Sequence, residues 1–274
     1  MTRRRGATIR CVDRSVRFVE TRTRREVAWV REDLAHLSLD AFWRPLEPLA
    51  GAKGRGGVGR LDVEGCAMVV RPYRRGGALG GLLADRYPTP ARARDELRVL
   101  CALDEQGVPA VAPVAAVARK RGAFWRLRLC TEWVGDARPL PQFFADLPSR
   151  RRQATVAVAD AVRRAFEAGL RHPDLHVDNV LCTPDGDGVQ AMLVDLDRAR
   201  LQPPLTERGR DDMLARMQRY CVKHRGELPA APTLAETMRF LVGLGLPRDE
   251  RRALWRRLAA RVDRATRRRR TLGR

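Results

Sequence analysis

Residues 172–179 read HPDLHVDN, and residues 193–197, at the end of an apolar run, read LVDLD. The first stretch has the pattern His-x-Asp-x-x-x-x-Asn, and Asp195 lies about sixteen residues beyond Asn179. This spacing is typical of phosphoryl-transfer sites of the protein-kinase type. The pattern therefore predicts a chain that transfers phosphate from ATP.

Three side chains stand in the order that this chemistry requires. Asp174 is the predicted acceptor of the proton of the attacking hydroxyl, and Asn179 and Asp195 are the predicted ligands of Mg²⁺, which prefers oxygen ligands. His172 is expected to shape the loop by hydrogen bonding. A zinc triad of His172, His176 and Asp174 is rejected, because no further cluster of ligands supports it.

Short alternating runs predict strands in the first half of the chain, and helical patterns dominate the second half. Helices are expected near residues 33–42, 91–106, 153–168, 207–225, 233–244 and 249–267. The predicted fold class is α+β and protein-kinase-like, with a small β-rich lobe over residues 1–134 and a helical lobe over residues 135–274. The nucleotide is expected between the lobes.

A glycine-rich segment precedes two predicted strands, with the spacing Gly54-x-Gly56-x-x-Gly59. Glycines let backbone N–H groups approach phosphate closely, so these three are predicted to bind the nucleotide. The alternative, a flexible loop without this role, is the better interpretation of the glycines taken alone. The strands and the catalytic segment that follow favour phosphate binding.

A kinase also needs a cation on the nucleotide phosphates, paired with a carboxylate on a helix. The strand over residues 66–71 ends in Arg71, whose guanidinium can bind phosphate through two donors. Glu96, on the helix predicted over 91–106, is the expected partner. The alternative that Glu96 is an ordinary exposed charge of this helix remains open. Lys53 is the alternative cation. Glu132, at the end of a later strand, marks the predicted hinge that contacts adenine.

The chain has a net charge of +21 over 274 residues, which attracts polyanions such as nucleic acid, anionic lipid or phosphorylated substrates. Its hydrophobic content of 44% is sufficient for a folded core. Its six cysteines show no C-x-x-C spacing and are expected to be reduced thiols. No signal peptide or membrane-spanning segment is expected, so the predicted location is cytoplasmic.

Several segments together resemble the lipopolysaccharide core kinases, and among these the 3-deoxy-D-manno-octulosonic acid (Kdo) kinases. The resemblance covers about residues 50–200 and rests on five stretches: VRPYRRGG at 70–77, LLADRY at 82–87, Thr131-Glu132 with Gly135, HPDLH with Asn179, and VDLDR at 194–198. Members of the family often have His where Pro72 stands and an aromatic residue where Leu196 stands.

The resemblance implies an ATP- and Mg²⁺-dependent kinase that phosphorylates the 4-OH of Kdo on a lipid A precursor. It implies Asp174 as catalytic base, Asp195 as metal ligand, and Arg in the place of the usual lysine at residue 71. Such an enzyme is expected to be peripheral, at the cytoplasmic face of the inner membrane. There the arginines, including the run at 267–270, face anionic lipid. Nucleic acid is not expected as a partner.

Two alternatives remain open. One is an atypical small protein kinase or an aminoglycoside-type phosphotransferase. Against a regulated protein kinase, the chain has no Ala-Pro-Glu after Asp195 and little room for an activation segment before the helix near residue 207. The other is a non-catalytic pseudokinase that binds anionic membrane or nucleic acid. Against this, both predicted metal ligands are present.

Overall fold

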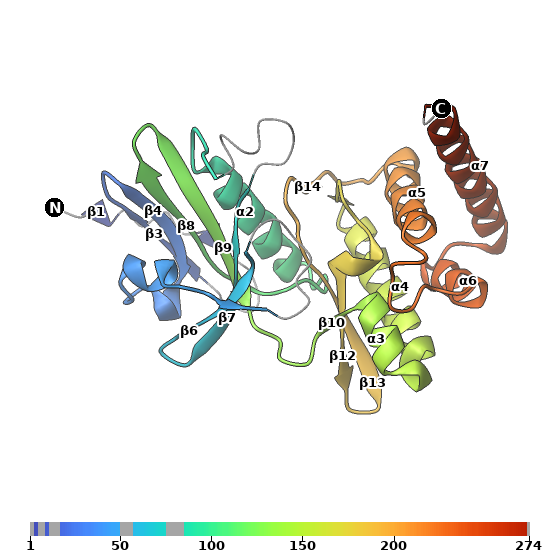
Figure 1. The fold of residues 1–274 in the computed structure, drawn as a ribbon, viewed down its shortest axis with the longest axis horizontal. Helices are drawn as coiled ribbons and strands as arrows, with labels where there is room; N and C mark the ends of the chain where they lie inside the picture. Colours follow the sequence, from blue (N-terminus) through green and yellow to red (C-terminus); the bar gives the residue numbers. More distant parts are fainter. Residues whose placement is uncertain (1–2, 5–8, 11–16, 50–56, 75–84, 273–274) are drawn as a thin grey trace. The chain divides into compact units, whose positions relative to one another are not determined.

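The computed structural model describes residues 3–4, 9–10, 17–49, 57–74 and 85–272, and side chains only from residue 17 to residue 264. The chain divides into two compact units (Figure 1). The first comprises Met1–Glu105 and Val111–Gly135, and the second comprises Gln106–Ala110 and Asp136–Arg274. The short segment 106–110 therefore packs with the second unit, although it precedes two strands of the first.

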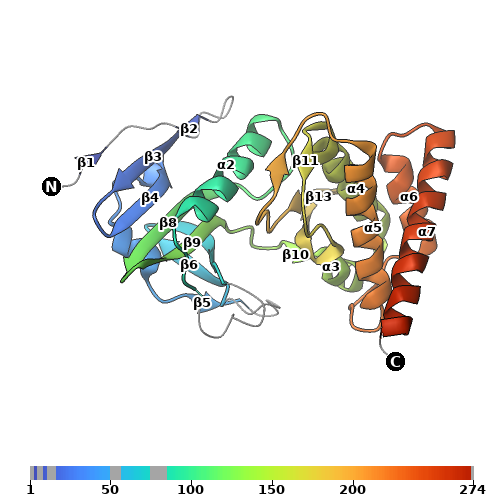
Figure 2. The same ribbon diagram turned by 90° about the horizontal axis from the view of Figure 1, so that it is seen from above.

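The first unit is built on one antiparallel sheet with the strand order β1-β3-β4-β8-β9-β7-β6-β5, and β2 pairs with β3. Helix α2 (Ala91–Glu105) packs against β8 and β9, as Figure 2 shows from above. The strands are β1 (Arg3–Arg4), β2 (Ile9–Arg10), β3 (Arg17–Arg22), β4 (Glu26–Arg31), β5 (Glu47–Pro48), β6 (Gly59–Val63), β7 (Cys66–Pro72), β8 (Pro113–Arg121) and β9 (Phe124–Glu132).

Apolar side chains from the strands and from the segment of residues 34–46 form a core of the first unit. Phe42, Met68, Val70 and Val114 are fully buried in it. Burial of a side chain of this size contributes about 1.5–3 kcal/mol. This core fixes β7 and β9 at the centre of the sheet and so determines where Arg71 ends its strand.

The prediction of one helix over residues 33–42 is wrong. Two short 3-10 helices, η1 (Glu32–Leu34) and η2 (Leu39–Trp43), occupy this region. Ser38 between them is extended, and its side chain accepts a hydrogen bond from the backbone N–H of Asp40. A serine that caps a new turn in this way interrupts a continuous helix.

The second unit combines helices with a β-hairpin formed by β12 and β13. Its helices are α3 (Leu140–Asp146), η3 (Pro148–Arg150), α4 (Arg151–Glu167), η4 (Val177–Asn179), α5 (Glu207–Lys223), α6 (Leu234–Gly243) and α7 (Arg248–Leu272). Its strands are β10 (Arg138–Pro139), β11 (Leu170–Arg171), β12 (Val180–Asp185), β13 (Gly188–Leu193) and β14 (Arg200–Leu201). The arginine run at 267–270 lies within α7, and its side chains are outside the described residues.

Helix α4 is the central support of the second unit, since it contacts both β13 and α6. A side chain at Gly243 of α6 would lie 2.5 Å from the Cβ of Ala159, so glycine is required for this approach. Helix α7 packs on α5, where the guanidinium of Arg257 lies 2.7 Å from the buried carboxylate of Asp211. These contacts hold α5 in place, and α5 contributes to the site described below.

Among the described residues, no helix has the combination of length and apolar character needed to cross a bilayer.

Candidate active site

In the first unit, Arg71 at the end of β7 pairs with Glu96 of α2. The Nη2 of Arg71 donates to both carboxylate oxygens of Glu96, at 2.5 and 2.6 Å. The Glu96 side chain is 1% exposed, whereas that of Arg71 is 23% exposed. Glu96 is therefore not an ordinary surface charge. Its burial fixes the guanidinium of Arg71, which remains partly exposed.

Tyr73 extends this cluster. Its hydroxyl donates to Oε2 of Glu96 at 2.5 Å, and the Arg71 guanidinium lies over its ring, 4.7 Å from the centroid. Arg92 also lies over this ring, at 5.5 Å, and over the ring of Tyr87, at 5.3 Å. The buried carboxylate thus has both a charged and a neutral donor, which is the condition for burying a charge without a large penalty.

The predicted glycine loop is only partly described. Gly54, Gly56 and the alternative cation Lys53 lie outside the described residues. Gly59 lies in β6, where a side chain would come within 2.6 Å of the Cβ of Leu46 and 2.7 Å of the carbonyl oxygen of Glu47. Glycine at this position is therefore required for the pairing of β5 with β6. Its role in binding phosphate stays a prediction.

Glu132 ends β9, and both its polar groups are engaged within the first unit. Its carboxylate accepts from Nη1 of Arg31 at 2.5 Å, and its backbone N–H donates to the carbonyl of Ala112. The next N–H, of Trp133, donates to the carbonyl of Ala67. A contact of Glu132 with adenine stays a prediction.

In the second unit, the imidazole of buried His172 shapes residues 172–179, the candidate catalytic loop, which is called the catalytic loop below. Its Nδ1 accepts from the backbone N–H of Asp174 at 3.1 Å, so the proton is on Nε2, which lies 3.4 Å from the carbonyl of Val194. Burial lowers the pKa of His172, which favours this neutral form. His172 thus ties the Asp174 segment to the segment before Asp195.

The hairpin brings Asn179 and Asp195 to the same end. Val180 pairs with Leu193, and the N–H of Val194 donates to the carbonyl of Asn179. The side-chain nitrogen of Asn179 donates to the carbonyl of Asp174 at 2.9 Å, which orients its amide oxygen away from that bond. Asp195 is exposed and has a φ of +56°, a left-handed conformation that Asp tolerates and that is common at functional sites.

These two side chains fit a magnesium site of the kind that kinases use. An amide oxygen and a carboxylate are hard ligands, and Mg²⁺ takes its remaining ligands from water and nucleotide phosphate. No group of three His, Cys, Asp or Glu side chains in the described part of the chain is arranged for a metal ion.

The carboxylate of Asp174 is open to solvent, with 62% of the side chain exposed. Its contacts with side chains are loose, because Nε2 of His176 and Nη1 of Arg216 both lie 3.7 Å away. The backbone of Asp174, by contrast, is held at its N–H by His172 and at its carbonyl by Asn179. A fixed backbone with an accessible carboxylate is what a proton acceptor for an incoming hydroxyl requires.

Helix α5 contacts the catalytic loop at two points. The Sδ of Met213 accepts from the N–H of His172 at 3.2 Å, and the hydroxyl of Tyr220 donates to Asp178 at 2.6 Å. The ring of Tyr220 also stacks on His176, with centroids 4.1 Å apart. Burial and the bond to Asp178 raise the pKa of Tyr220, so its hydroxyl stays a donor. Nδ1 of His176 is buried without a hydrogen-bond partner.

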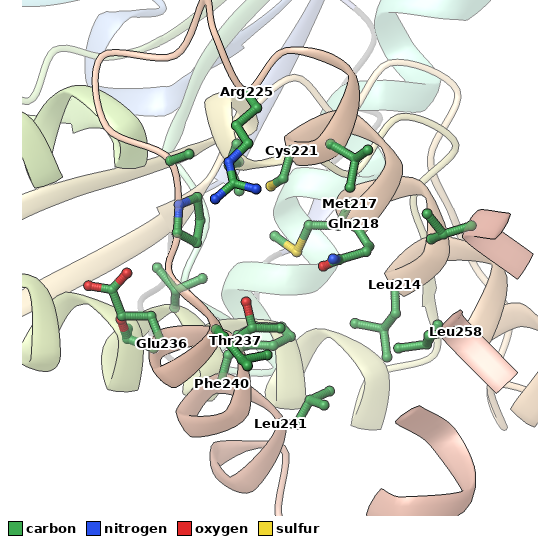
Figure 3. A pocket seen from close by; sticks show the side chains of 18 of the residues that line it. Leu214, Met217, Gln218, Cys221, Arg225, Glu236, Thr237, Phe240, Leu241 and Leu258 are labelled. Carbon is green, nitrogen blue, oxygen red and sulfur yellow. The ribbon is translucent and has the colours of Figure 1, made fainter. Parts of the chain in front are cut away.

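A largely apolar cavity of about 400 Å³ lies beside α5 (Figure 3). Leu214, Met217 and Cys221 of α5 line it, and so does Val177 of the catalytic loop. Burial raises the pKa of the Cys221 thiol to about 11, so it is protonated at neutral pH. Arg225 and Glu236 are charged groups in the lining. The cavity can accept an apolar ligand behind the catalytic loop.

The family model described as "Lipopolysaccharide kinase (Kdo/WaaP) family" matches residues 40–241. The chain belongs to this family. Membership confirms the resemblance seen in the sequence and makes the chain a kinase of lipopolysaccharide synthesis, and hence a phosphotransferase.

Individual relatives agree with this. A 3-deoxy-D-manno-octulosonic acid kinase from Stenotrophomonas maltophilia (strain R551-3) is 30% identical over 205 residues, covering 72% of this chain and 80% of the relative. Another, from Xanthomonas oryzae pv. oryzae (strain PXO99A), is 33% identical over 177 residues, covering 63% and 69%.

Among solved structures, "WaaP in complex with acyl carrier protein" matches with a TM-score of 0.56 and 20% identity, covering 82% of this chain and 90% of the other. This likeness confirms the predicted kinase-like α+β fold, with a β-rich first unit and a helical second unit.

Sequence reasoning missed the contributions of Tyr73, Met213, Arg216 and Tyr220. Tyr73 lies in a stretch that carries the resemblance, but nothing in its spacing indicates a bond to Glu96. The other three lie on α5, far along the chain from the catalytic loop. Their spacing on one face of a helix was a readable signal, but only the packing of α5 shows what that face meets.

Proposed function

We propose that this chain transfers the γ-phosphate of ATP to a hydroxyl of the lipopolysaccharide inner core, the 4-OH of a Kdo residue on a lipid A precursor. One observation carries the proposal. The accessible carboxylate of Asp174 is held through its backbone next to Asn179, at the end of the hairpin that also presents Asp195. This arrangement occurs in a chain of the lipopolysaccharide kinase family.

In the proposed reaction the acceptor hydroxyl attacks the γ-phosphorus, the bond from phosphorus to the ADP oxygen breaks, and the hydroxyl proton passes to Asp174. Asn179 and Asp195 hold Mg²⁺, which when bound neutralises charge on the phosphate oxygens. His172 and Asn179 keep the Asp174 carboxylate in position by fixing the backbone on both sides of it. Positioning and electrostatic stabilisation together account for most of the catalysis in phosphoryl transfer.

The first unit is proposed to bind the nucleotide. Arg71, held by Glu96 and Tyr73, contacts the phosphates with its partly exposed guanidinium. Gly54, Gly56 and Gly59 supply backbone donors, and Glu132 lies at the adenine end. An arginine suits the first role because its planar fork can bond Glu96 and phosphate at the same time.

The proposed acceptor explains the charge of the chain. A net charge of +21 favours a phosphorylated, acidic lipid in an anionic membrane surface over a neutral substrate. We therefore propose peripheral attachment at the cytoplasmic face of the inner membrane. The apolar cavity behind Val177 supports a lipid-linked acceptor, because it offers room for part of an acyl chain. Nucleic acid is not a proposed partner.

The test is transfer of radioactive phosphate from γ-labelled ATP to purified Kdo-bearing lipid A precursor. Transfer is expected with Mg²⁺ and is expected to disappear when EDTA removes the metal. The same lipid without Kdo serves as the control acceptor and is expected to stay unlabelled. Labelling of the Kdo-free lipid, or transfer that survives EDTA, would contradict the proposal.

The second candidate is a phosphotransferase for a small molecule. It is favoured over a regulated protein kinase by the short path from Asp195 to α5, which begins at Glu207. β14 occupies residues 200 and 201 of this path and pairs with β11, so little chain is left to bind a peptide. Phosphate transfer to an aminoglycoside, with none to Kdo, would favour this candidate.

A further inference from the structure

Arg216 on α5 has no role in the proposed reaction so far, yet its guanidinium is the cation closest to Asp174. Its Nη1 lies 3.7 Å from Oδ1 of Asp174, and its side chain is 47% exposed. Among the described residues this is its only ion pair. A charge-assisted hydrogen bond normally measures about 2.7–2.9 Å, so most donors of Arg216 are not used by this contact.

The position of Arg216 is fixed by the two anchors of α5. Met213, three residues before Arg216, and Tyr220, four residues after it, both form hydrogen bonds with the catalytic loop. Residues with this spacing share one face of a helix, so Arg216 lies on the face of α5 that meets the loop. The stack of Tyr220 on His176 further restricts how α5 can turn. The backbone of Arg216 is thus placed beside the proposed proton acceptor by contacts that do not involve the Arg216 side chain.

Stability does not explain this arrangement. An exposed ion pair at this distance contributes little to folding, and the anchors at Met213 and Tyr220 already attach the helix. The part of Arg216 that is not used by Asp174 points to an external anion, since a planar fork of donors matches carboxylate and phosphate groups.

We propose that Arg216 determines acceptor specificity by binding an anionic group of the acceptor next to the hydroxyl that is phosphorylated. The inference rests on the proposed function. The named acceptor of the relatives is an octulosonic acid, and its carboxylate belongs to the same sugar as the reacting hydroxyl. A phosphate of the lipid has the same binding chemistry, and the experiment separates the two sources.

The experiment compares the wild type with Arg216→Gln and with Arg208→Gln, which removes an exposed charge from the first turns of the same helix. Three acceptors are used: Kdo-bearing lipid A precursor, the same lipid with the Kdo carboxylate reduced to an alcohol, and the same lipid without its phosphates. Each protein is assayed for kcat/KM toward the acceptor and for KM toward ATP, and for ATP hydrolysis without acceptor. Thermal unfolding checks the fold.

On the complete acceptor, Arg216→Gln is expected to lower kcat/KM by roughly 10- to 100-fold, the size of a lost charge-assisted hydrogen bond. KM for ATP, ATP hydrolysis and thermal stability stay unchanged, and Arg208→Gln behaves as the wild type. Reduction of the Kdo carboxylate lowers kcat/KM of the wild type by the same factor and leaves kcat/KM of Arg216→Gln almost unchanged. If removal of the lipid phosphates gives this pattern instead, the bound anion is a phosphate.

The proposal is overturned if carboxylate reduction and phosphate removal each lower kcat/KM of Arg216→Gln as much as that of the wild type. It is also overturned if ATP hydrolysis by Arg216→Gln falls along with phosphate transfer. In the latter case Arg216 acts on the transferred phosphate. Acceptor binding measured without ATP separates this inference from the proposed function. Binding that depends on Arg216 without any phosphate transfer refutes the function alone, whereas normal transfer and binding by Arg216→Gln refute the inference alone.

Discussion

Arg71 and Glu96 in the first unit meet at 2.5 Å with the carboxylate 1% exposed, whereas Asp174 and Arg216 in the second unit lie 3.7 Å apart with the carboxylate 62% exposed. The first acid accepts hydrogen bonds from Arg71 on both its oxygens and one from the hydroxyl of Tyr73. The second is fixed only through its backbone. An arginine and a carboxylate thus form a closed pair, Arg71 with Glu96, in one unit and an open pair, Arg216 with Asp174, in the other.

The difference shows that burial suits the two carboxylates to different roles. A buried carboxylate that is fully hydrogen-bonded holds its partner rigidly, but it cannot accept a proton without loss of those bonds. An exposed carboxylate with a fixed backbone can accept one when a hydroxyl arrives. The closed pair is therefore suited to orient Arg71 on a nucleotide, and the open pair to meet an acceptor.

The largest effect on nucleotide binding is expected for Asp195→Asn, which removes a predicted metal ligand from the second unit. Affinity for Mg-ATP should fall by about 100-fold or more, because even indirect supports of a metal commonly cost about 10- to 100-fold. Calorimetric titration with a non-hydrolysable ATP analogue and Mg²⁺ measures this. Asp187→Asn, at the exposed turn of the same hairpin, is the matched control. Unchanged affinity in Asp195→Asn would make Asp195 a structural residue only.

Glu96→Gln tests the closed pair through stability. Removal of one partner from a buried ion pair leaves an uncompensated charge, so the free energy of unfolding should fall by about 3 kcal/mol. The neighbouring Asp95→Asn removes an exposed carboxylate paired with Arg94 and should cost less than about 1 kcal/mol. Urea denaturation compares the two. Equal losses would show that burial does not distinguish these acids.

The contrast between the units also explains what sequence could predict. Asp174, Asn179 and Asp195 follow a spacing set by one loop and one hairpin, so local sequence was enough to place them together. The partnership of Arg71 with Glu96 followed from the order of strand and helix. The contacts of Arg216 and Tyr220 depend on how α5 packs against a loop some forty residues earlier in the chain. No local sequence pattern shows which loop this face of α5 meets. The helix expected over residues 33–42 failed because the capping preference of Ser38 outweighed the apolar periodicity.

Arg71→Lys tests whether the closed pair needs the fork of arginine. Lysine keeps the charge but cannot bond Glu96 and a phosphate along two edges of one plane, so we expect kcat/KM for ATP to fall by roughly tenfold. Steady-state kinetics with varied ATP measures this, and KM for the acceptor should not change. Turnover that improves in Arg71→Lys would show that only the charge matters.

The smallest effect is expected from pH, at the Arg151–Glu236 pair beside the apolar cavity. Burial alone would raise the pKa of Glu236, but hydrogen bonds from Arg151 and Thr233 hold it at about 2. Because this pKa is below the ordinary value of 4.5, the pair stabilises the fold above pH 4.5 and loses this contribution as the pH falls toward 2. The difference in melting temperature between wild type and Glu236→Gln should therefore shrink over this range. A constant difference would contradict the assignment.

The role of Asp174 is the central claim, and the most direct test measures two quantities on one variant. Asp174→Ala should bind Mg-ATP with unchanged affinity but transfer phosphate to Kdo-bearing lipid A precursor about 100- to 10,000-fold more slowly, the usual contribution of a general base. Phosphate transfer by Asp174→Ala at the wild-type rate would contradict the account, because the open carboxylate would then not be the proton acceptor.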